Sequence, residues 1–287
     1  MSATNNQPEA RVAGARARGS GPILILAVLF LVATFLAWYF TWFGRDLSDA
    51  DISRYLSDTR NPRHVQHALL QVQQRIERGD PTAKRWYPQL LSLSGNNETE
   101  FRLTVAWLMG FDNHSSEFHA ALGKLLHDGE PIVRRNAALA LVRFNDHSGR
   151  EELLSILKPY DVKSPVAGTI ASTLREGSEI ARGSLLARIQ QADGQATEVR
   201  SPLPGRINKI TKGNGSQVTV NEQILSINSD EESVWEALRG LSLIGQPEDL
   251  TTIDNYAGSN ASSERVREQA RVAVEAIKNR ADQKSKP

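Results

Sequence analysis

The feature that most constrains the fold of this 287-residue chain is a run of short β-type segments that occurs twice in succession. Residues 162–170, VKSPVAGTI, are matched by residues 199–207, VRSPLPGRI. Valine, isoleucine and threonine at short spacing, separated by glycine and proline, are typical of strands and tight turns. The duplication therefore predicts an all-β domain over residues 160–229, built from two similar halves.

Four glycines recur at equivalent places in the two halves: Gly168 and Gly177 in the first, Gly205 and Gly215 in the second. Glycine adopts backbone angles that tight corners require and that other residues avoid. We therefore interpret these four residues as the motif glycines at the corners of the β domain.

The pattern Val-x-Ser-Pro-x-x-Gly-x-Ile, followed by Gly-x-x-Val or Gly-x-x-Ile and an apolar segment, resembles the biotinyl/lipoyl-type barrel-sandwich hybrid. The resemblance implies a flattened barrel to which each half contributes one layer. Carrier members of that family attach biotin or lipoate to a lysine in the hairpin between the halves. Here the hairpin at 190–197 reads QQADGQAT and has no lysine. We therefore expect no cofactor on this domain.

Unmodified domains of this kind resemble the lipoyl-like domains of periplasmic adaptor, or membrane fusion, proteins. In those adaptors a long helical hairpin separates the two halves. In this chain only a short segment lies between Ile189 and Val199. The resemblance to an efflux adaptor is therefore partial.

A second repeat, with helical spacing, flanks the β segment. Residues 101–109, FRLTVAWLM, match residues 133–141, VRRNAALAL, and a polar turn and a second amphipathic segment follow each block. Residues 130–141 resemble HEAT and related armadillo-type repeats. The resemblance implies a solenoid of stacked helix pairs over 48–159 that continues over 230–281, with the β domain inserted between these two parts.

Each helical block opens with an arginine at the same place. The three arginines are Arg102, Arg134 and Arg267. In HEAT-like repeats an arginine of this kind commonly bonds neighbouring loops. We therefore expect the three side chains to be structural and not to bind a ligand.

The third constraint is the apolar stretch 23–43, which contains no charged residue. A helix of this length spans about 30 Å, the thickness of the hydrocarbon core of a bilayer. The stretch predicts a transmembrane helix over 22–43 after a polar tail at 1–21. A cleaved signal peptide is the alternative, but its apolar core would be shorter and would end in small residues.

Three arginines precede this stretch and two follow it closely. The positive-inside rule favours a cytoplasmic N-terminus and a periplasmic C-terminal body, with the chain in the inner (plasma) membrane. The last residues, 282–287, are polar and predict a disordered tail.

The chain has 34 basic and 33 acidic residues, so its charge does not favour nucleic acid as a partner. It has no cysteine, which excludes disulfides, thiolate metal sites and cysteine nucleophiles. His64 and His67 could share one helix face, but no nearby carboxylate completes a metal motif. We therefore expect no catalytic, cofactor-binding or metal-binding residue, and no enzyme.

These features predict a multi-domain α plus β protein with one transmembrane helix, a HEAT-like solenoid and an inserted barrel-sandwich hybrid. The leading hypothesis is a non-enzymatic, single-pass membrane scaffold or adaptor that contacts the lipid bilayer and protein partners in a transport-type or secretion-type complex. One alternative is an accessory subunit of a membrane enzyme, or a degenerate carrier-like module that binds a small ligand non-covalently. A true efflux adaptor is a third reading, weakened by the missing helical hairpin.

Overall fold

The computed structural model describes residues 21–42, 46–259 and 262–285. The chain forms two compact units, Met1–Ser48 and Asp49–Pro287. The first unit contains helix α1 (Gly21–Trp42), which coincides with the apolar stretch of the sequence. A search of the described residues finds no helix with the length and hydropathy needed for a membrane crossing, so the predicted span at 22–43 is not found there. Phe43 and the predicted tail up to residue 20 lie outside the described residues.

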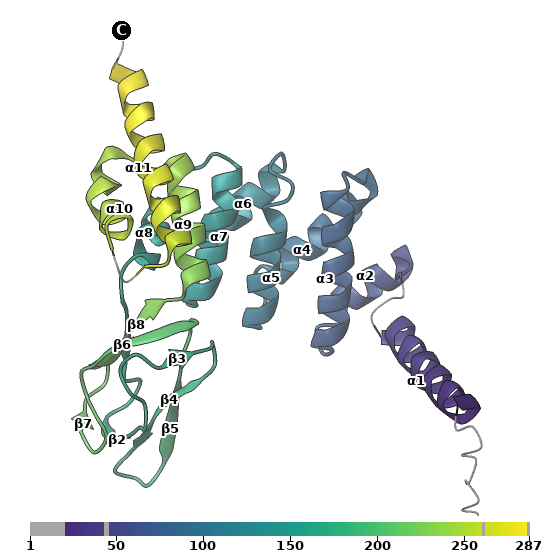
Figure 1. Cartoon of the computed structure of the whole chain (residues 1–287), viewed down its shortest axis with the longest axis horizontal. Helices are drawn as coiled ribbons and strands as arrows, with labels where there is room; N and C mark the ends of the chain where they lie inside the picture. The colour runs from purple at the N-terminus through teal and green to yellow at the C-terminus, as the bar shows by residue number, and fades with distance from the viewer. Residues whose placement is uncertain (1–20, 43–45, 260–261, 286–287) are drawn as a thin grey trace, which may run out of the picture. The chain divides into compact units, whose positions relative to one another are not determined.

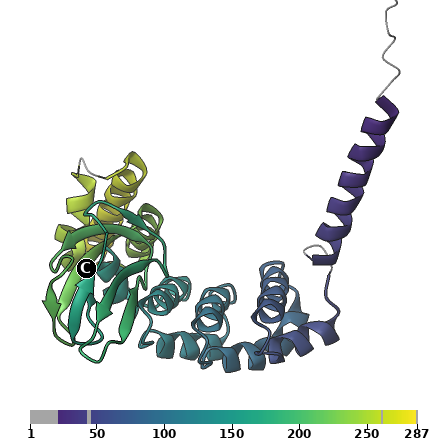
Figure 2. The same cartoon turned by 90° about the horizontal axis from the view of Figure 1, so that it is seen from below.

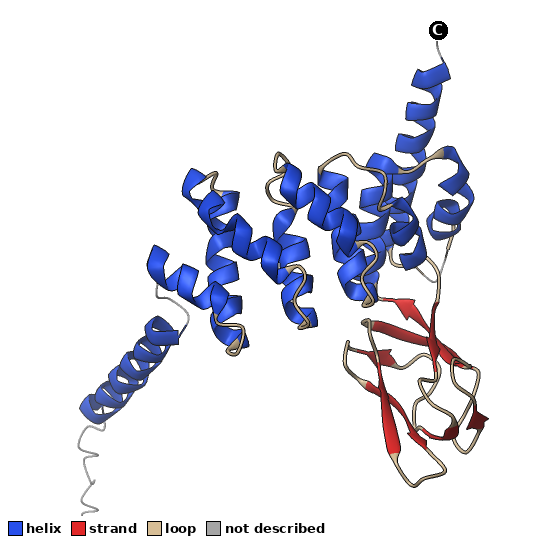
Figure 3. Cartoon of the chain, turned by 180° about the vertical axis from the view of Figure 1, so that it is seen from behind, coloured by secondary structure: helices blue, strands red, loops and turns tan. Residues whose placement is uncertain are grey.

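The second unit combines a helical region with a β domain, and Figure 3 shows its strands gathered in one module. The helices before the strands are α2 (Asp49–Ser57), α3 (Pro62–Glu77), the 3-10 helix η1 (Pro81–Trp86), α4 (Tyr87–Leu93), α5 (Thr99–Met109), α6 (Ser116–Leu125), α7 (Pro131–Arg143) and α8 (Arg150–Ile156). Those after them are α9 (Glu231–Ile244), the 3-10 helix η2 (Pro247–Asp249), α10 (Leu250–Ala257) and α11 (Glu264–Ser285).

The helices of this unit pack in two layers. Helices α3, α5, α7 and α9 follow one another in the first layer, each packed against the next (Figures 1 and 2). Helices α2, α4, α6 and α8 pack against them from the second layer. The apolar positions that align between residues 101–109 and 133–141 are buried in this packing, including Phe101, Val105, Val133 and Leu141. No single helix pair could bury these side chains alone, so the pairs depend on their neighbours.

The prediction of a disordered tail at 282–287 is wrong for its first part, because α11 continues to Ser285. Residues 286–287 lie outside the described residues. Residues 282–285 read DQKS, and their glutamine and lysine have high intrinsic helix propensity, although the aspartate and serine do not. A polar composition alone therefore did not indicate where the helix stops.

The β domain contains eight strands between Tyr160 and Ser229, the range predicted from the duplication. They are β1 (Tyr160–Lys163), β2 (Gly168–Ala171), β3 (Glu179–Ile180), β4 (Leu185–Gln190), β5 (Ala196–Arg200), β6 (Gly205–Ile210), β7 (Gln217–Val218) and β8 (Gln223–Ser229). One sheet has the order β1-β8-β6-β3 and the other β5-β4-β2-β7. Buried apolar residues, such as Ile170, Ile189 and Ile207, form a core of their own between the sheets.

The two halves of the β domain use the same local contacts. Ser164 Oγ donates to the Val166 carbonyl at 2.5 Å, and Ser201 Oγ donates to the Leu203 carbonyl at the same distance. The two Ser-Pro segments of the sequence are therefore matching turns. Each hydroxyl satisfies a nearby carbonyl that the sheet leaves free.

The halves also exchange backbone hydrogen bonds. The Gly177 N–H donates to the Ile207 carbonyl at 2.8 Å, and the Gly215 N–H donates to the Ile170 carbonyl at 2.8 Å. Each half of the β domain therefore needs the other half to satisfy these backbone hydrogen bonds.

The first and last strands of the β domain pair antiparallel, with Tyr160 opposite Ile227. This pairing returns the chain to the place where it left the helical region. Helices α8 and α9 therefore pack against each other, and Leu153 shares one core with Leu238 and Leu241. The β domain is inserted between two helices that are neighbours in space.

The carboxylate of Asp128 accepts Nε and Nη2 of Arg102 at 2.7 and 3.0 Å. Its side chain is only 8% exposed. Burial alone would raise the pKa of Asp128, but the hydrogen bonds from Arg102 and from the Glu130 N–H outweigh it and hold the pKa below the usual value. The ionised carboxylate therefore contributes to stability.

Arg135, in helix α7, is also nearly buried, with 4% of its surface exposed. Its Nε and Nη1 are buried without a hydrogen-bond partner in the described part of the chain. Burial lowers the pKa of Arg135, while Glu152 and Asp230 oppose that shift through their charges. A buried guanidinium that lacks direct partners costs stability.

We predict that Asp128→Asn reduces the loss in the free energy of unfolding that the protein shows as the pH falls into the acid range. The folded-state pKa of Asp128 is depressed, so its stabilisation is present above the unfolded value of about 3.9 and disappears as the pH falls through the folded value. Urea unfolding at a series of pH values should show a smaller loss in the variant. Asp254→Asn, at an exposed position of α10, is the control; an equal slope in wild type and Asp128→Asn would contradict the prediction.

We predict that Arg135→Met raises the free energy of unfolding by about 1 to 3 kcal/mol, because an apolar side chain of similar length removes the unsatisfied charge. The matched control is Arg134→Met, which removes hydrogen bonds to Glu152 and to two carbonyls and should lower stability. Urea unfolding of both variants checks the signs. A loss of stability in Arg135→Met would show that the guanidinium has a favourable environment after all.

Candidate functional site

The hairpin between the two halves is a plain tight turn. It joins β4 to β5, and the Gln191 N–H donates to the Gln195 carbonyl at 2.8 Å. Gly194 has a φ of +85°, which glycine tolerates at little cost. Asp193 Oδ1 accepts the Gln195 N–H at 3.0 Å, so its carboxylate closes the turn. The hairpin offers no amine to which a carrier group could be attached.

The motif glycines fall into two kinds. Gly177 and Gly215 have φ values of +82° and +81° and form corners. Gly168 and Gly205 are instead places of close approach, because an added Cβ would lie 2.3 Å from the Gln190 carbonyl oxygen or 2.1 Å from that of Asn228. All four residues shape the barrel.

The repeat arginines occupy equivalent positions. Nη1 of Arg102 donates to the carbonyls of Asn96 and Asn97 at 2.8 and 3.0 Å, just before α5. Arg134 makes the same contact with the carbonyl of Asp128 before α7, and Arg267 with that of Ser262 before α11. These bonds to the preceding loop are what a structural role requires, and that role stays a prediction for all three.

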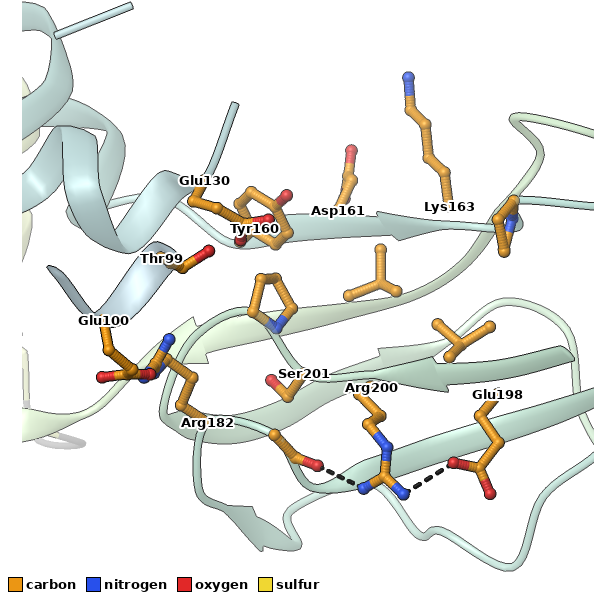
Figure 4. A pocket seen from close by; sticks show the side chains of 15 residues that line it. Thr99, Glu100, Glu130, Tyr160, Asp161, Lys163, Arg182, Glu198, Arg200 and Ser201 are labelled. Atoms are coloured by element: carbon orange, nitrogen blue, oxygen red, sulfur yellow. Dashed lines mark hydrogen bonds and ion pairs between the residues drawn. The ribbon is translucent and has the colours of Figure 1, made fainter. Parts of the chain in front are cut away.

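The feature that sequence reasoning missed is an open cavity of about 790 Å³ between the β domain and the helical region, seen from close by in Figure 4. Strands β1 and β5 line it on the side of the β domain. Thr99 and Glu100 at the start of α5 and Glu130 before α7 line it on the other side. Its residues lie far apart in the sequence, so no local motif indicated it.

Both strands that line the cavity are edge strands. β1 is the outer strand of one sheet and β5 the outer strand of the other. An edge strand carries backbone groups that have no neighbour within its own sheet. The cavity is therefore bordered both by side chains and by the outer edges of two strands.

The cavity is charged but nearly balanced. Arg182 forms an ion pair with Glu100, which links the β domain to α5. Arg200 pairs with Glu198 at 2.7 Å and donates to the Gly183 carbonyl at 2.9 Å (Figure 4). Lys163 also lines the cavity and extends from β1. Acidic and basic side chains are therefore mixed along the lining.

The lining suggests no catalytic arrangement. The Ser201 hydroxyl already donates to a backbone carbonyl, as described above. His64 lies elsewhere, where its Nδ1 is 3.0 Å from Asp58 Oδ2, and His67 Nε2 is 3.0 Å from Gln71 Nε2. Within the described residues, no group of three or more histidine or acidic side chains could hold a metal ion.

Comparisons with known proteins identify part of the chain. A family model described as "RND MFP, barrel-sandwich hybrid domain" matches residues 158–228. No match is found among curated proteins. A solved structure titled "Structure and function of a single-chain, multi-domain long-chain acyl-coa carboxylase" is similar at 16% identity and a TM-score of 0.24. That match covers 26% of this chain and 8% of the other, so the chain spans a small part of that protein's length.

The family match and the geometry agree on the β domain. Two four-stranded sheets, paired corner glycines and a duplicated strand pattern occupy the matched residues. The chain therefore contains a barrel-sandwich hybrid domain like those of periplasmic adaptor proteins, joined to a helical region.

Proposed function

We propose that the protein is a non-enzymatic adaptor of a membrane or envelope complex of the transport or secretion type. The observation that carries this proposal is a carrier-type barrel that lacks the carrier lysine and presents two open strand edges to a cavity. Such a barrel retains the shape of a docking module without the means to carry a covalent cofactor.

The edges of β1 and β5 supply the physical basis for docking. An extended segment of a partner can add to an exposed strand edge by backbone hydrogen bonds, while side-chain pockets select its sequence. Here the edges border a cavity of about 790 Å³ that also contacts the starts of α5 and α7. A bound segment would therefore touch the β domain and the helical region together.

The HEAT-like reading of the helical region is part of the same proposal. Its support is the alignment of 101–109 with 133–141, the burial of the aligned positions and the equivalent bonds of Arg102, Arg134 and Arg267. Stacked helix pairs leave long exposed surfaces that suit protein partners.

The membrane anchor and its orientation are also proposed. Their support is the sequence alone: 23–43 has no charged residue, and three arginines precede it. The proposal places the N-terminus in the cytoplasm and the body in the periplasm.

A second candidate function is non-covalent binding of a small ligand, as in a degenerate carrier module or an accessory subunit of a membrane enzyme. The volume of the cavity favours it, because small-molecule sites commonly enclose about 300 to 1,000 Å³. The cross-linking experiment below separates it from protein docking.

We predict that a photo-cross-linking residue at Lys163 forms discrete covalent adducts with protein in living cells. The matched control is Lys209 in β6, which is exposed on the same domain but does not line the cavity. Adducts are resolved by electrophoresis and mass spectrometry. The absence of adducts at Lys163, or the same adducts at both positions, would contradict docking at the cavity and favour the small-ligand reading.

We predict that a reporter enzyme active only after export is active when fused behind Pro287, and that a reporter active only in the cytoplasm is not. The reason is the excess of arginine before the apolar stretch. Measuring both activities in the same strain gives the ratio. Cytoplasmic activity alone would reverse the orientation and remove periplasmic partners from the proposal.

A further inference from the structure

The layer formed by α3, α5, α7 and α9 carries a group of arginine and aromatic side chains, from the last turns of α5 and α7 and the first half and middle of α9. Trp107 and Phe111 come from α5 and the turn after it, Arg143 is the last residue of α7, and Trp235 and Arg239 come from α9. We call these five residues the arginine–tryptophan face. It is separate from the cavity between β1 and β5.

Arg143 is held against two aromatic rings. Its guanidinium carbon lies 5.1 Å from the ring centroid of Trp107 and 4.4 Å from that of Phe111. The two rings meet edge to face with centroids 4.7 Å apart. Trp107 is nonetheless 39% exposed, which is high for so large an apolar side chain. The rings fix the guanidinium and leave one aromatic surface open.

A second arginine, Arg239 on the neighbouring helix α9, lies over a single ring that it shares with Arg265. The guanidinium carbon of Arg239 lies 5.5 Å from the Trp235 ring centroid, and that of Arg265 lies 4.3 Å from it. Arg265 also forms an ion pair with Glu232 at 2.5 Å. Arg143 and Arg239 differ from Arg265 in this respect, because neither has an ion-pair partner in the part of the chain that the structure describes.

Arg143 and Arg239 are close enough to influence each other. Burial lowers the pKa of Arg143, and the charge of Arg239 lowers it further. Glu236 and Glu77 act in the opposite direction through their charges without forming a salt bridge to Arg143. Two like charges thus lie on the packed helices α7 and α9, without side-chain hydrogen bonds to other described residues, and an added carboxylate would relieve their repulsion.

Exposed aliphatic side chains occur on the same layer. Leu70 of α3 is 51% exposed and Leu243 of α9 is 58% exposed. A hydrogen bond of 3.2 Å between Gln66 and Thr104 ties α3 to α5 about one turn before Leu70 and Trp107. Leu70 and Trp107 therefore lie at a similar level along the neighbouring helices α3 and α5.

We propose that the arginine–tryptophan face binds an acidic peptide segment of a protein partner, with its carboxylates on Arg143 and Arg239 and its apolar side chains on Trp107. The planar guanidinium of arginine matches the two oxygens of a carboxylate, and tryptophan and arginine are both enriched among the residues that contribute most to binding at protein interfaces.

The test uses the full chain in detergent micelles and a fluorescein-labelled peptide of Glu-Glu-Leu repeats, followed by fluorescence anisotropy. The same peptide with glutamine in place of glutamate is the matched ligand control. We expect Arg143→Met and Arg239→Met each to weaken binding about tenfold, because each variant loses the charge-assisted hydrogen bonds to a peptide carboxylate. Arg143→Lys should retain part of the affinity.

Arg206→Met is the matched protein control, because this exposed arginine of β6 lies outside the face and pairs with Glu179. Thermal unfolding verifies that each variant is folded. Peptide affinity within twofold of wild type in the Arg143→Met Arg239→Met double variant would overturn the proposal. Equal binding of the glutamine peptide, no binding at 1 mM peptide, or equal binding of a single-stranded oligonucleotide would also overturn it. Because the cavity is elsewhere, failure here leaves the cross-linking prediction at Lys163 standing.

Discussion

The antiparallel pairing of β1 with β8 is the constraint on which the second unit depends. It places Tyr160 opposite Ile227 and so returns the chain beside the point where it left α8. Helix α9 can therefore pack on α8, and Leu153 can share a core with Leu238 and Leu241. If the first and last strands did not pair, an insertion of this size would separate two helices that must bury each other's apolar faces.

The insertion also creates the candidate site. Because the β domain leaves the helical region through neighbouring strands, the edge strand β1 lies beside the starts of α5 and α7. Arg182 reaches across to Glu100, and the cavity forms around this contact. The same topology that preserves the helical core thus exposes two strand edges next to it. The pairing of β1 with β8 therefore underlies both the packing of the helices and the proposed docking site.

The helical region offers a different kind of surface. Its interior is apolar and closely packed, whereas the layer of α3, α5, α7 and α9 presents arginines that lie on aromatic rings. The guanidinium groups of Arg102 and Arg134 donate hydrogen bonds to loop carbonyls and to carboxylates. Among the described residues, neither Arg143 nor Arg239 forms an ion pair, which is why the proposal assigns these two arginines to a partner.

A duplicated pattern of strands, prolines and glycines was enough to predict the β domain, because such a pattern can satisfy its backbone only as two matching halves. It also indicated the helical blocks, since buried positions at 101–109 and 133–141 follow helical spacing, and it excluded a carrier lysine from 190–197. It did not locate the end of α11, where polar residues with high helix propensity continue the helix.

Which side chains meet across long separations in the sequence follows from tertiary packing. Arg182, in the turn between β3 and β4, pairs with Glu100 of α5, and no local pattern marks the two as neighbours. The lack of a hydrogen-bond partner for Nε and Nη1 of Arg135 among the described residues is likewise a property of packing, because it depends on the elements that bury this side chain. Local sequence fixes periodicity and turns, whereas the cavity and the arginine–tryptophan face arise from how separate elements pack.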